Sequence, residues 1–301
     1  MSGRHGLLVV DKPQGLTSHD VVAQARRLFR ERAVGHAGTL DPMATGVLVL
    51  LFGEACKLSG HLTGQDKTYR ATVQFGVGTD SLDADGRTVE TAELPDSFPD
   101  ETALEQALEI ERSRSEQVPP AVSAIHDQGE RAHVKARRGE AVVLAPRPVR
   151  VSALRALGRE PRAVHLEVSA AKGYYVRALA RDLGLTLGVP AHLSALRRLA
   201  SGPFRLAEAV SWPQPEPPAL VPLADAARRA LPVTELSPEA VAFARQGKVL
   251  RSEQANPSSL DQLSAWLSPE GELVALGLSL PDGTHRVVRG FVSVPPASAH
   301  G

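Results

Sequence analysis

The sequence GHAGTLDPMATGVLVLLFGEACK, residues 35–57, gives the main indication of the fold. Residues 35–46 form a loop by composition, with three glycines, one proline and four polar side chains. Residues 47–52 are an unbroken apolar run, which is too short to cross a membrane and predicts a strand buried on both faces. A loop that leads into a buried strand is a rigid mount for reactive side chains.

Asp41 is the candidate reactive group of this loop. Because Pro42 disfavours a helical backbone at the residue before it, Asp41 should be held in an extended conformation. For an isolated Asp-Pro pair, an aspartate that only caps a turn is the alternative. The wider pattern favours chemistry, since residues 35–46 resemble the signature loop G-H-x-G-x-L-D-P-x-A-x-G of the TruB family of pseudouridine synthases. The resemblance implies that Asp41 is the catalytic nucleophile.

His36 belongs to the same signature. It lies five residues before Asp41 and is flanked by Gly35 and Gly38, whose small size permits a close approach of RNA. The resemblance implies that the His36 ring stacks in the gap left when the target uridine is extruded. A histidine that only bonds the loop backbone is the alternative.

Composition sets broader limits. A chain of 301 residues can form one large domain and a small one, and 43% hydrophobic residues allow a sizeable core. The single cysteine, Cys56, excludes an intramolecular disulfide and a cysteine-based zinc site. We find no signal peptide and no apolar run of membrane-spanning length, so the sequence predicts a cytoplasmic protein with no membrane association.

The charge is unevenly distributed although the formal net charge is zero. Residues 80–116 carry 12 acidic and 3 basic side chains, a balance of −9. Residues 131–205 carry 15 lysines and arginines against 4 acidic residues, a balance of +11. The asymmetry predicts a basic face that meets a polyanion and an acidic segment that faces elsewhere, although solvated surface charges could give the same counts.

The N-terminal residues predict a strand, a turn and a helix. Residues 7–10 are apolar, and Thr17 and Asp20 have the spacing of a capping box at a helix start. Residues 11–18 resemble the D-K-P-x-G-x-[ST]-S pattern of the TruB family. That likeness implies that Lys12 and Pro13 shape a wall of the active site.

Residues 68–75 alternate between apolar and polar side chains, as a half-buried strand does. Tyr69 lies on the apolar face, where a tyrosine is more often part of the core. However, residues 66–70 resemble the family pattern D-K-x-Y-R. The resemblance implies that the Tyr69 ring stacks on the extruded base.

Residues 76–86, GVGTDSLDADG, could be mistaken for a calcium loop. Ala92 stands where an EF-hand requires its bidentate glutamate, so no metal site is predicted. The segment resembles a T-D-x-x-D-x-x-G turn of the family, which implies that Asp80 lies near the active site.

A basic stretch of poor periodicity, residues 119–150, resembles the RNA-gripping insertion of the family. His126 and His133 replace the lysine and tyrosine that are usual there. Their spacing of seven, without further candidate ligands nearby, does not favour a metal site.

Residues 171–177, AKGYYVR, resemble the family pattern S-K-G-x-Y-[IV]-R, with Ala171 in place of the serine. The resemblance implies that Arg177 pairs with Asp41, and a guanidinium beside a carboxylate lowers its pKa. It also implies that Tyr175 contacts the substrate. Residues 196–202 resemble L-R-R-x-x-x-G, which implies that Leu196 lines the pocket.

These observations predict an α/β pseudouridine synthase fold, with a mixed, largely antiparallel sheet and flanking helices. We predict a catalytic domain at residues 1–212 that includes the insertion. Five prolines indicate a stiff linker at residues 213–222. The resemblance implies that residues 223–301 form a small, β-rich, PUA-like RNA-binding domain.

The resemblance implies an isomerase that converts uridine 55 in the TΨC loop of tRNA to pseudouridine, without a cofactor or a metal. It implies a monomer that binds the TΨC stem-loop and requires no protein partner. Two alternatives are a non-catalytic tRNA-folding chaperone and a guide-RNA-dependent synthase of the same superfamily. The candidate catalytic set of Asp41, Tyr69 and Arg177 disfavours the first, and the basic insertion disfavours the second.

Overall fold

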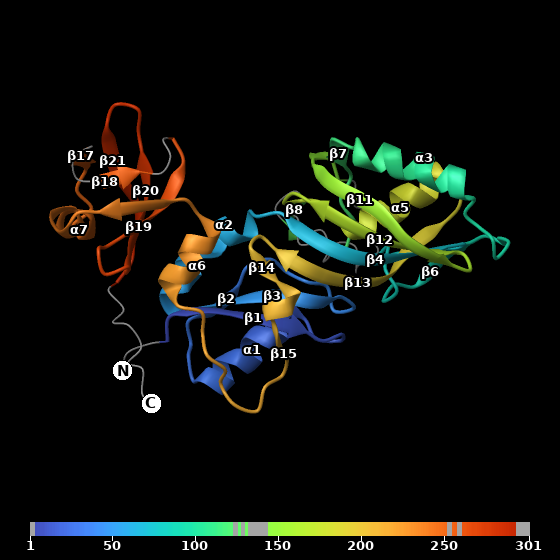
Figure 1. The fold of residues 1–301 in the computed structure, drawn as a ribbon. Helices are drawn as coiled ribbons and strands as arrows, with labels where there is room; N and C mark the ends of the chain where they lie inside the picture. The colour runs from blue at the N-terminus through green and yellow to red at the C-terminus, as the bar shows by residue number, and fades with distance from the viewer. Residues whose placement is uncertain are drawn as a thin grey trace.

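The protein folds around two β-sheets, one of nine strands and one of six, in a computed structural model (Figure 1). The structure describes residues 4–122, 126–127, 130–131, 144–251, 255–257 and 261–292. His133 and most of the basic insertion lie outside the described residues, and His126 is described only as part of a short backbone strand.

The large sheet is mixed and largely antiparallel, as predicted. Its order is β11, β12, β4, β13, β3, β1 and β15, with β14 paired to β13 and β2 paired to β3. Only the β13–β3 and β1–β15 pairs are parallel. The strands are β1 (Gly6–Lys12), β2 (Val34–His36), β3 (Thr45–Phe52), β4 (Lys67–Phe75), β11 (Val151–Glu160), β12 (Ala163–Ala170), β13 (Ala191–Ser201), β14 (Phe204–Arg205) and β15 (Val210–Ser211).

Three helices cover one face of this sheet: α1 (Ser18–Phe29), α3 (Glu101–Arg112) and α5 (Val176–Thr186). Figure 1 shows α3 and α5 beside β11 and β12, and α1 beside β1. The predicted capping box at Thr17 and Asp20 is confirmed, and it starts α1. The apolar side of α1 packs onto alternate residues of β1 and β3, because side chains along a strand point to opposite faces.

The prediction that β3 is buried on both faces is confirmed. Leu48, Leu50 and Phe52 join the core under the three helices. Val49 and Leu51 point the other way, into a second core that includes α6 (Leu223–Ala230) and residues of the six-stranded sheet. The two cores hold β3 rigidly, and the loop before it with it.

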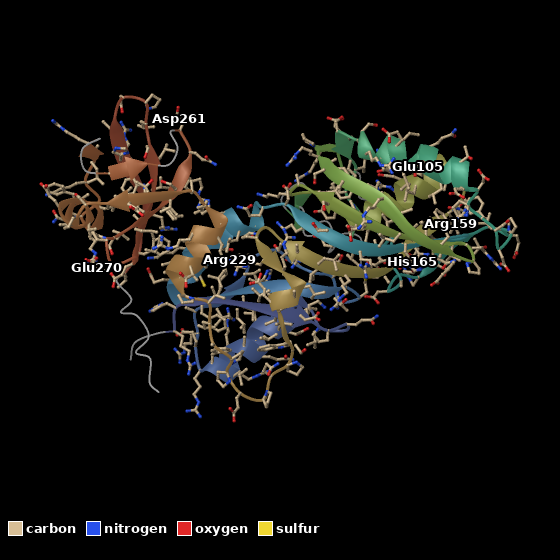
Figure 2. The ribbon with its side chains drawn as sticks, viewed as in Figure 1. Glu105, Arg159, His165, Arg229, Asp261 and Glu270 are labelled. Atoms are coloured by element: carbon tan, nitrogen blue, oxygen red, sulfur yellow. The ribbon has the colours of Figure 1, made fainter. Side chains whose placement is uncertain are left out.

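The six-stranded sheet has the order β17, β21, β20, β19, β16 and β18. Its elements are β16 (Val233–Leu236), α7 (Pro238–Arg245), β17 (Leu250–Arg251), β18 (Ala255–Pro257), β19 (Leu263–Leu267), β20 (Leu273–Ser279) and β21 (Thr284–Gly290). Arg229 of α6 lies between the two sheets (Figure 2), 2.6 Å from Glu208 and over the ring of Phe204.

Short elements complete the described chain. They are the 3₁₀ turns η1 (Gly53–Leu58) and η2 (Leu206–Glu208), helix α2 (Ser59–Thr63), and the strands β5 (Val77–Thr79), β6 (Thr88–Thr91), β7 (Glu116–Gln117), β8 (His126–Asp127), β9 (Glu130–Arg131) and β10 (Arg147–Pro148). Among the described residues, no helix is both long and apolar enough to span a membrane.

Candidate active site

A cavity of about 1230 Å³ lies over the middle of the large sheet. Its walls come from the loop at residues 38–42, the first turn of α1, the start of β4, the turn between β5 and β6, and the residues that lead into α5. Segments that are far apart in the sequence therefore meet at one site, and Asp41 is among the residues that line it.

Buried side chains fix the loop that carries Asp41. The Ser18 hydroxyl accepts a hydrogen bond from Leu40 N at 2.8 Å and donates one to Leu40 O at 3.2 Å. The Arg198 guanidinium, only 1% exposed, donates to Val47 O at 2.6 Å and to Gly38 O at 3.0 Å. The backbone on both sides of Asp41 is thus held by side chains from α1 and β13.

Gly46, at the end of the same loop, is constrained by this contact. Its φ is +100°, which favours glycine, and a Cβ at this position would lie 2.2 Å from Arg198 O. A side chain at position 46 would push β13 away from β3. The last glycine of the signature is therefore required by packing.

The pairing of Asp41 with Arg177 has the predicted partners in a two-pronged geometry. Arg177 Nε lies 3.0 Å from Asp41 Oδ2, and Arg177 Nη2 donates to Asp41 Oδ1 at 3.3 Å. The Asp41 side chain is 35% exposed to the cavity, whereas that of Arg177 is 7% exposed. The planar guanidinium therefore orients the carboxylate from behind and leaves it open to a ligand.

Arg177 is itself held in place by the turn between β5 and β6 and by Val122. Its Nη1 donates to Ser81 O at 2.9 Å, and its Nη2 donates to Val122 O at 3.0 Å. Asp83 Oδ2 lies 3.5 Å from Nη1 and supplies a second negative charge. The buried arginine consequently has two carboxylate partners and two backbone acceptors.

The pKa of Asp41 lies above the ordinary value for aspartate. Burial disfavours the charged carboxylate and is the largest cause, and Asp83 also raises the pKa. Arg177 acts in the opposite direction, as predicted, but it does not outweigh burial. Burial therefore sets the net direction of the shift, and Arg177 limits the rise.

Three of the predicted substrate-contacting residues line the cavity: Tyr69, Tyr175 and Leu196. Tyr69 is on β4, opposite Arg198 in the register of β13. Tyr175 directly precedes α5, and its backbone is fastened to Gln117, which donates to Tyr175 O and accepts from Tyr175 N at 2.9 Å. Two aromatic rings and an apolar side chain thus accompany the carboxylate.

Lys12 and Pro13 are not among the cavity-lining residues. Lys12 is fully buried, and its Nζ donates to Leu16 O at 2.6 Å, Pro13 O at 2.8 Å and Pro42 O at 3.4 Å. Burial lowers the pKa of Lys12 to about 8. Lys12 therefore supports the loop that carries Asp41 through its hydrogen bond to Pro42 O, without lining the cavity.

His36 is also behind the cavity wall. Its ring packs edge-on against the ring of His19, with centroids 5.5 Å apart, and it is His19 that lines the cavity. Burial lowers the pKa of His36 to about 4, so this ring is neutral near pH 7. A neutral ring suits a stacking role beside His19.

The first turn of the acidic segment lies on the cavity wall, where Asp80 was predicted to be near the site. Asp80, Asp83 and Asp85 line the cavity. Asp80 pairs with Arg87 at 3.1 Å, and hydrogen bonds from Arg87 lower its pKa. The carboxylate of this turn that reaches Arg177 is that of Asp83, three residues further on.

Ser18, Asp83 and Arg198 were not predicted as site residues, although each lies inside a recognised motif. Burial of a charged or hydroxyl side chain identifies them here, and a single sequence shows burial of polar residues poorly. The described residues contain no cluster of histidine, cysteine and acidic side chains suited to a metal ion.

The geometry can be compared with known proteins. Residues 26–176 match the model of the TruB family pseudouridylate synthase N-terminal domain, and residues 177–214 match that of the tRNA pseudouridylate synthase B C-terminal domain. A Cutibacterium acnes protein named tRNA pseudouridine synthase B is 44% identical over 278 residues, which are 90% of this chain and 92% of the relative. A Mycobacterium protein of the same name is 42% identical over 299 residues, 97% of each chain.

Solved structures agree in fold. The structure titled as a Cbf5-Nop10-Gar1 complex superimposes with a TM-score of 0.71 at 26% identity, over 96% of this chain and 84% of that one. A second, titled as an H/ACA RNP bound to a substrate RNA containing 2′-deoxyuridine, has the same TM-score at 25% identity, over 96% of this chain and 86% of that one. With a carboxylate–arginine pair, a tyrosine and the signature loop on one cavity, this chain belongs to the TruB family of pseudouridylate synthases.

Proposed function

We propose that this protein isomerises uridine 55 in the TΨC loop of tRNA to pseudouridine, with Asp41 as the attacking carboxylate. The observation that carries the proposal is the Asp41–Arg177 pair. It presents an oriented carboxylate to a cavity that Tyr69 and Tyr175 also line. The relatives named tRNA pseudouridine synthase B support tRNA as the substrate.

In the reaction, the N1–C1′ glycosidic bond breaks and a C5–C1′ bond forms. The hydrogen on C5 is lost as a proton, and N1 gains a proton, so no oxidant or group donor is needed. Asp41 can attack C1′ or C6, or assist removal of the 2′ proton. Extrusion of the base brings it to the rings of Tyr69 and Tyr175, which can hold a flat pyrimidine while it turns.

The protein should act alone and as a monomer in the cytoplasm. We expect the purified chain to form pseudouridine in unmodified tRNA without a guide RNA or a second protein, as measured by mass spectrometry of digested tRNA. The solved neighbours are complexes by title. A strict requirement for a guide RNA would therefore favour the second alternative, and tight tRNA binding without any turnover would favour a chaperone.

We propose the domain division at residues 212 and 223. Residues before 212 supply the nine-stranded sheet, and the six-stranded sheet begins after 232. The exposed residues of the second sheet include Arg286 and Arg289, which suit an RNA-binding role for this region.

Binding of tRNA should weaken steeply as salt is added. The balance of +11 in residues 131–205 predicts several phosphate contacts, and each contact releases counterions. We expect the affinity to fall by at least about tenfold between roughly 50 and 200 mM salt. Filter binding or fluorescence anisotropy measures it, and a flat salt dependence would contradict a basic RNA-binding face.

Replacement of His36 should affect folded tRNA selectively. If its ring, with His19, supports the gap left by the extruded uridine, His36→Ala should lose up to about 1–3 kcal/mol of stacking only where a stack exists. We expect a larger loss of kcat/KM on intact tRNA than on an unstructured uridine oligonucleotide.

His165→Ala is the matched control. His165 lies on β12 (Figure 2). The strand register places it on the face opposite Tyr69, and its ring is hydrogen-bonded to Thr72 and Glu160. Equal losses for His36→Ala on both substrates would mean that His36 only stabilises the loop.

A further inference from the structure

The acidic and basic side chains that line the cavity lie at different ends of it along β4. The residues at the start of β4 pair with Ser201 and Ala170, and Val73, near its end, pairs with Leu193. Leu193 in turn bridges to Asp83. Six residues of extended strand span about 20 Å, so Lys67 and the acidic turn lie at opposite ends of the cavity. Figure 1 shows β4 running from α2 towards β6.

One end carries Asp80, which pairs with Arg87, Asp83, which pairs with Arg177, and Asp85. The other end carries Lys67, Lys172 and Arg198, and among the described residues no carboxylate lines this end. Arg198 is committed to backbone carbonyls of the loop. Lys67 and Lys172 are therefore the cations of this end that can meet a ligand.

Lys67 is held in position. It is only 8% exposed, and its Nζ donates to Thr63 O and Gln65 O, each at 2.6 Å. An ammonium has three donors, so one remains for the cavity. The neighbouring carboxylate, Asp66, is paired with Arg150 at 3.1 Å. Lys172, by contrast, is exposed on the loop between β12 and α5.

The carboxylate of Asp66, which is itself paired with Arg150, balances only part of the positive charge at this end. Among the described residues, no ion pair involves Lys67 or Lys172. Burial lowers the pKa of Lys67 to about 8, the like charge of Arg198 lowers it further, Asp66 raises it, and the like charge of Lys172 lowers it. A bound anion would relieve this repulsion and favour the charged ammonium.

We propose that Lys67 and Lys172 form a phosphate-binding subsite that holds the backbone phosphate next to the extruded uridine. Asp41 and the aromatic rings would then take the nucleoside, while the lysine end takes the phosphate. This assignment rests on the proposed function, because it needs an RNA substrate. It adds two residues that position the nucleotide and do not take part in bond making.

The test compares Lys67→Met and Lys172→Gln with Arg27→Gln. Arg27 is exposed on α1 and does not line the cavity, so its replacement removes one positive charge elsewhere. Equilibrium binding of a TΨC stem-loop RNA is measured in the full-length chain carrying Asp41→Asn, at several salt concentrations. Each lysine variant should bind at least about threefold more weakly at low salt, and the slope of log K against log salt should fall by roughly 0.7–0.9. Arg27→Gln should change neither.

Neutral-linkage RNA identifies the phosphate. A series of stem-loops carries one uncharged methylphosphonate linkage at successive positions around the target uridine. When the uncharged linkage replaces the phosphate that the lysine contacts, the lysine variant and the unsubstituted lysine should bind the RNA equally well, because that RNA has no charge for the lysine to contact. A penalty that persists on every RNA of the series, or an unchanged salt slope, would overturn the subsite.

Two further measurements, of the melting temperature and of wild-type turnover, accompany the binding experiments. If Lys67→Met lowers the melting temperature markedly, the exposed Lys172→Gln variant decides the result. Turnover by the wild-type chain is measured in parallel. If the wild type is inactive but the lysine variants bind RNA more weakly as expected, the proposed function is wrong and the phosphate subsite stands. If the wild type is active but the lysine variants bind RNA normally, the proposed function stands and the phosphate subsite is wrong.

Discussion

Asp41→Asn should abolish pseudouridine formation and leave tRNA binding nearly unchanged. Asparagine keeps the shape of the side chain and an oxygen that can accept from Arg177, but it cannot act as a nucleophile or a base. Loss of an essential nucleophile costs about 10⁴-fold or more in turnover. Single-turnover pseudouridine formation measures the chemical step, and filter binding measures the affinity.

The fold should tolerate this change. Arg177 retains Asp83 at 3.5 Å and the carbonyls of Ser81 and Val122, so its charge is not left uncompensated. Asp96→Asn is the matched control, because Asp96 also pairs with an arginine, Arg162, at 2.7 Å on the exposed surface. A residual rate of Asp41→Asn within tenfold of wild type would exclude Asp41 as the nucleophile.

The sequence predicted the elements that carry a regular apolar pattern. β3 has an unbroken apolar run, β4 alternates, and α1 has both an amphipathic face and a capping box, so each was identified with nearly its true limits. β11 and β13 were not predicted as strands. β11 is an edge strand with almost all of its side chains exposed, so burial imposes little pattern on it.

Some residues of the candidate site could likewise be located from the sequence, and others could not. Residues with a fixed spacing inside a motif, such as Asp41 and Tyr69, could be located from the sequence, and both line the cavity. Which aspartate of the turn after β5 reaches Arg177 depends on how that turn folds. Asp83 is set there by its bridge to Leu193 of β13, 110 residues away in the chain, and no local pattern contains that information.

The direction of the pKa shift of Asp41 also could not be predicted without the fold. From the sequence, the Arg177 guanidinium was expected to lower the pKa of Asp41 and to keep the carboxylate ionised. Whether it does depends on how much water the carboxylate loses, and that follows from the packing of the loop against α1, α5 and the turn after β5. Burial wins in the structure, so the pKa is raised, and Arg177 reduces the rise.

This balance makes Arg177→Lys an informative change. Lysine keeps a positive charge but lacks the planar fork, so it cannot bond both Asp41 oxygens while donating to Ser81 O and Val122 O. A misplacement of the reacting group by about 1 Å can cost on the order of a hundredfold in rate. We expect the loss mainly in turnover, because the pair orients the reacting group.

The pH profile separates orientation from charge. If the Asp41 carboxylate is the reacting form, the single-turnover rate rises with pH through the pKa of Asp41. Arg177 lowers that pKa, so weakening the pair raises it, and the acid limb of the profile should move to higher pH in Arg177→Lys. Arg162→Lys, at the surface pair with Asp96, should leave both the rate and the limb in place. A lower rate with an unmoved acid limb would mean that Arg177 acts by position alone, and an unchanged rate would mean that the pairing has no part in the reaction.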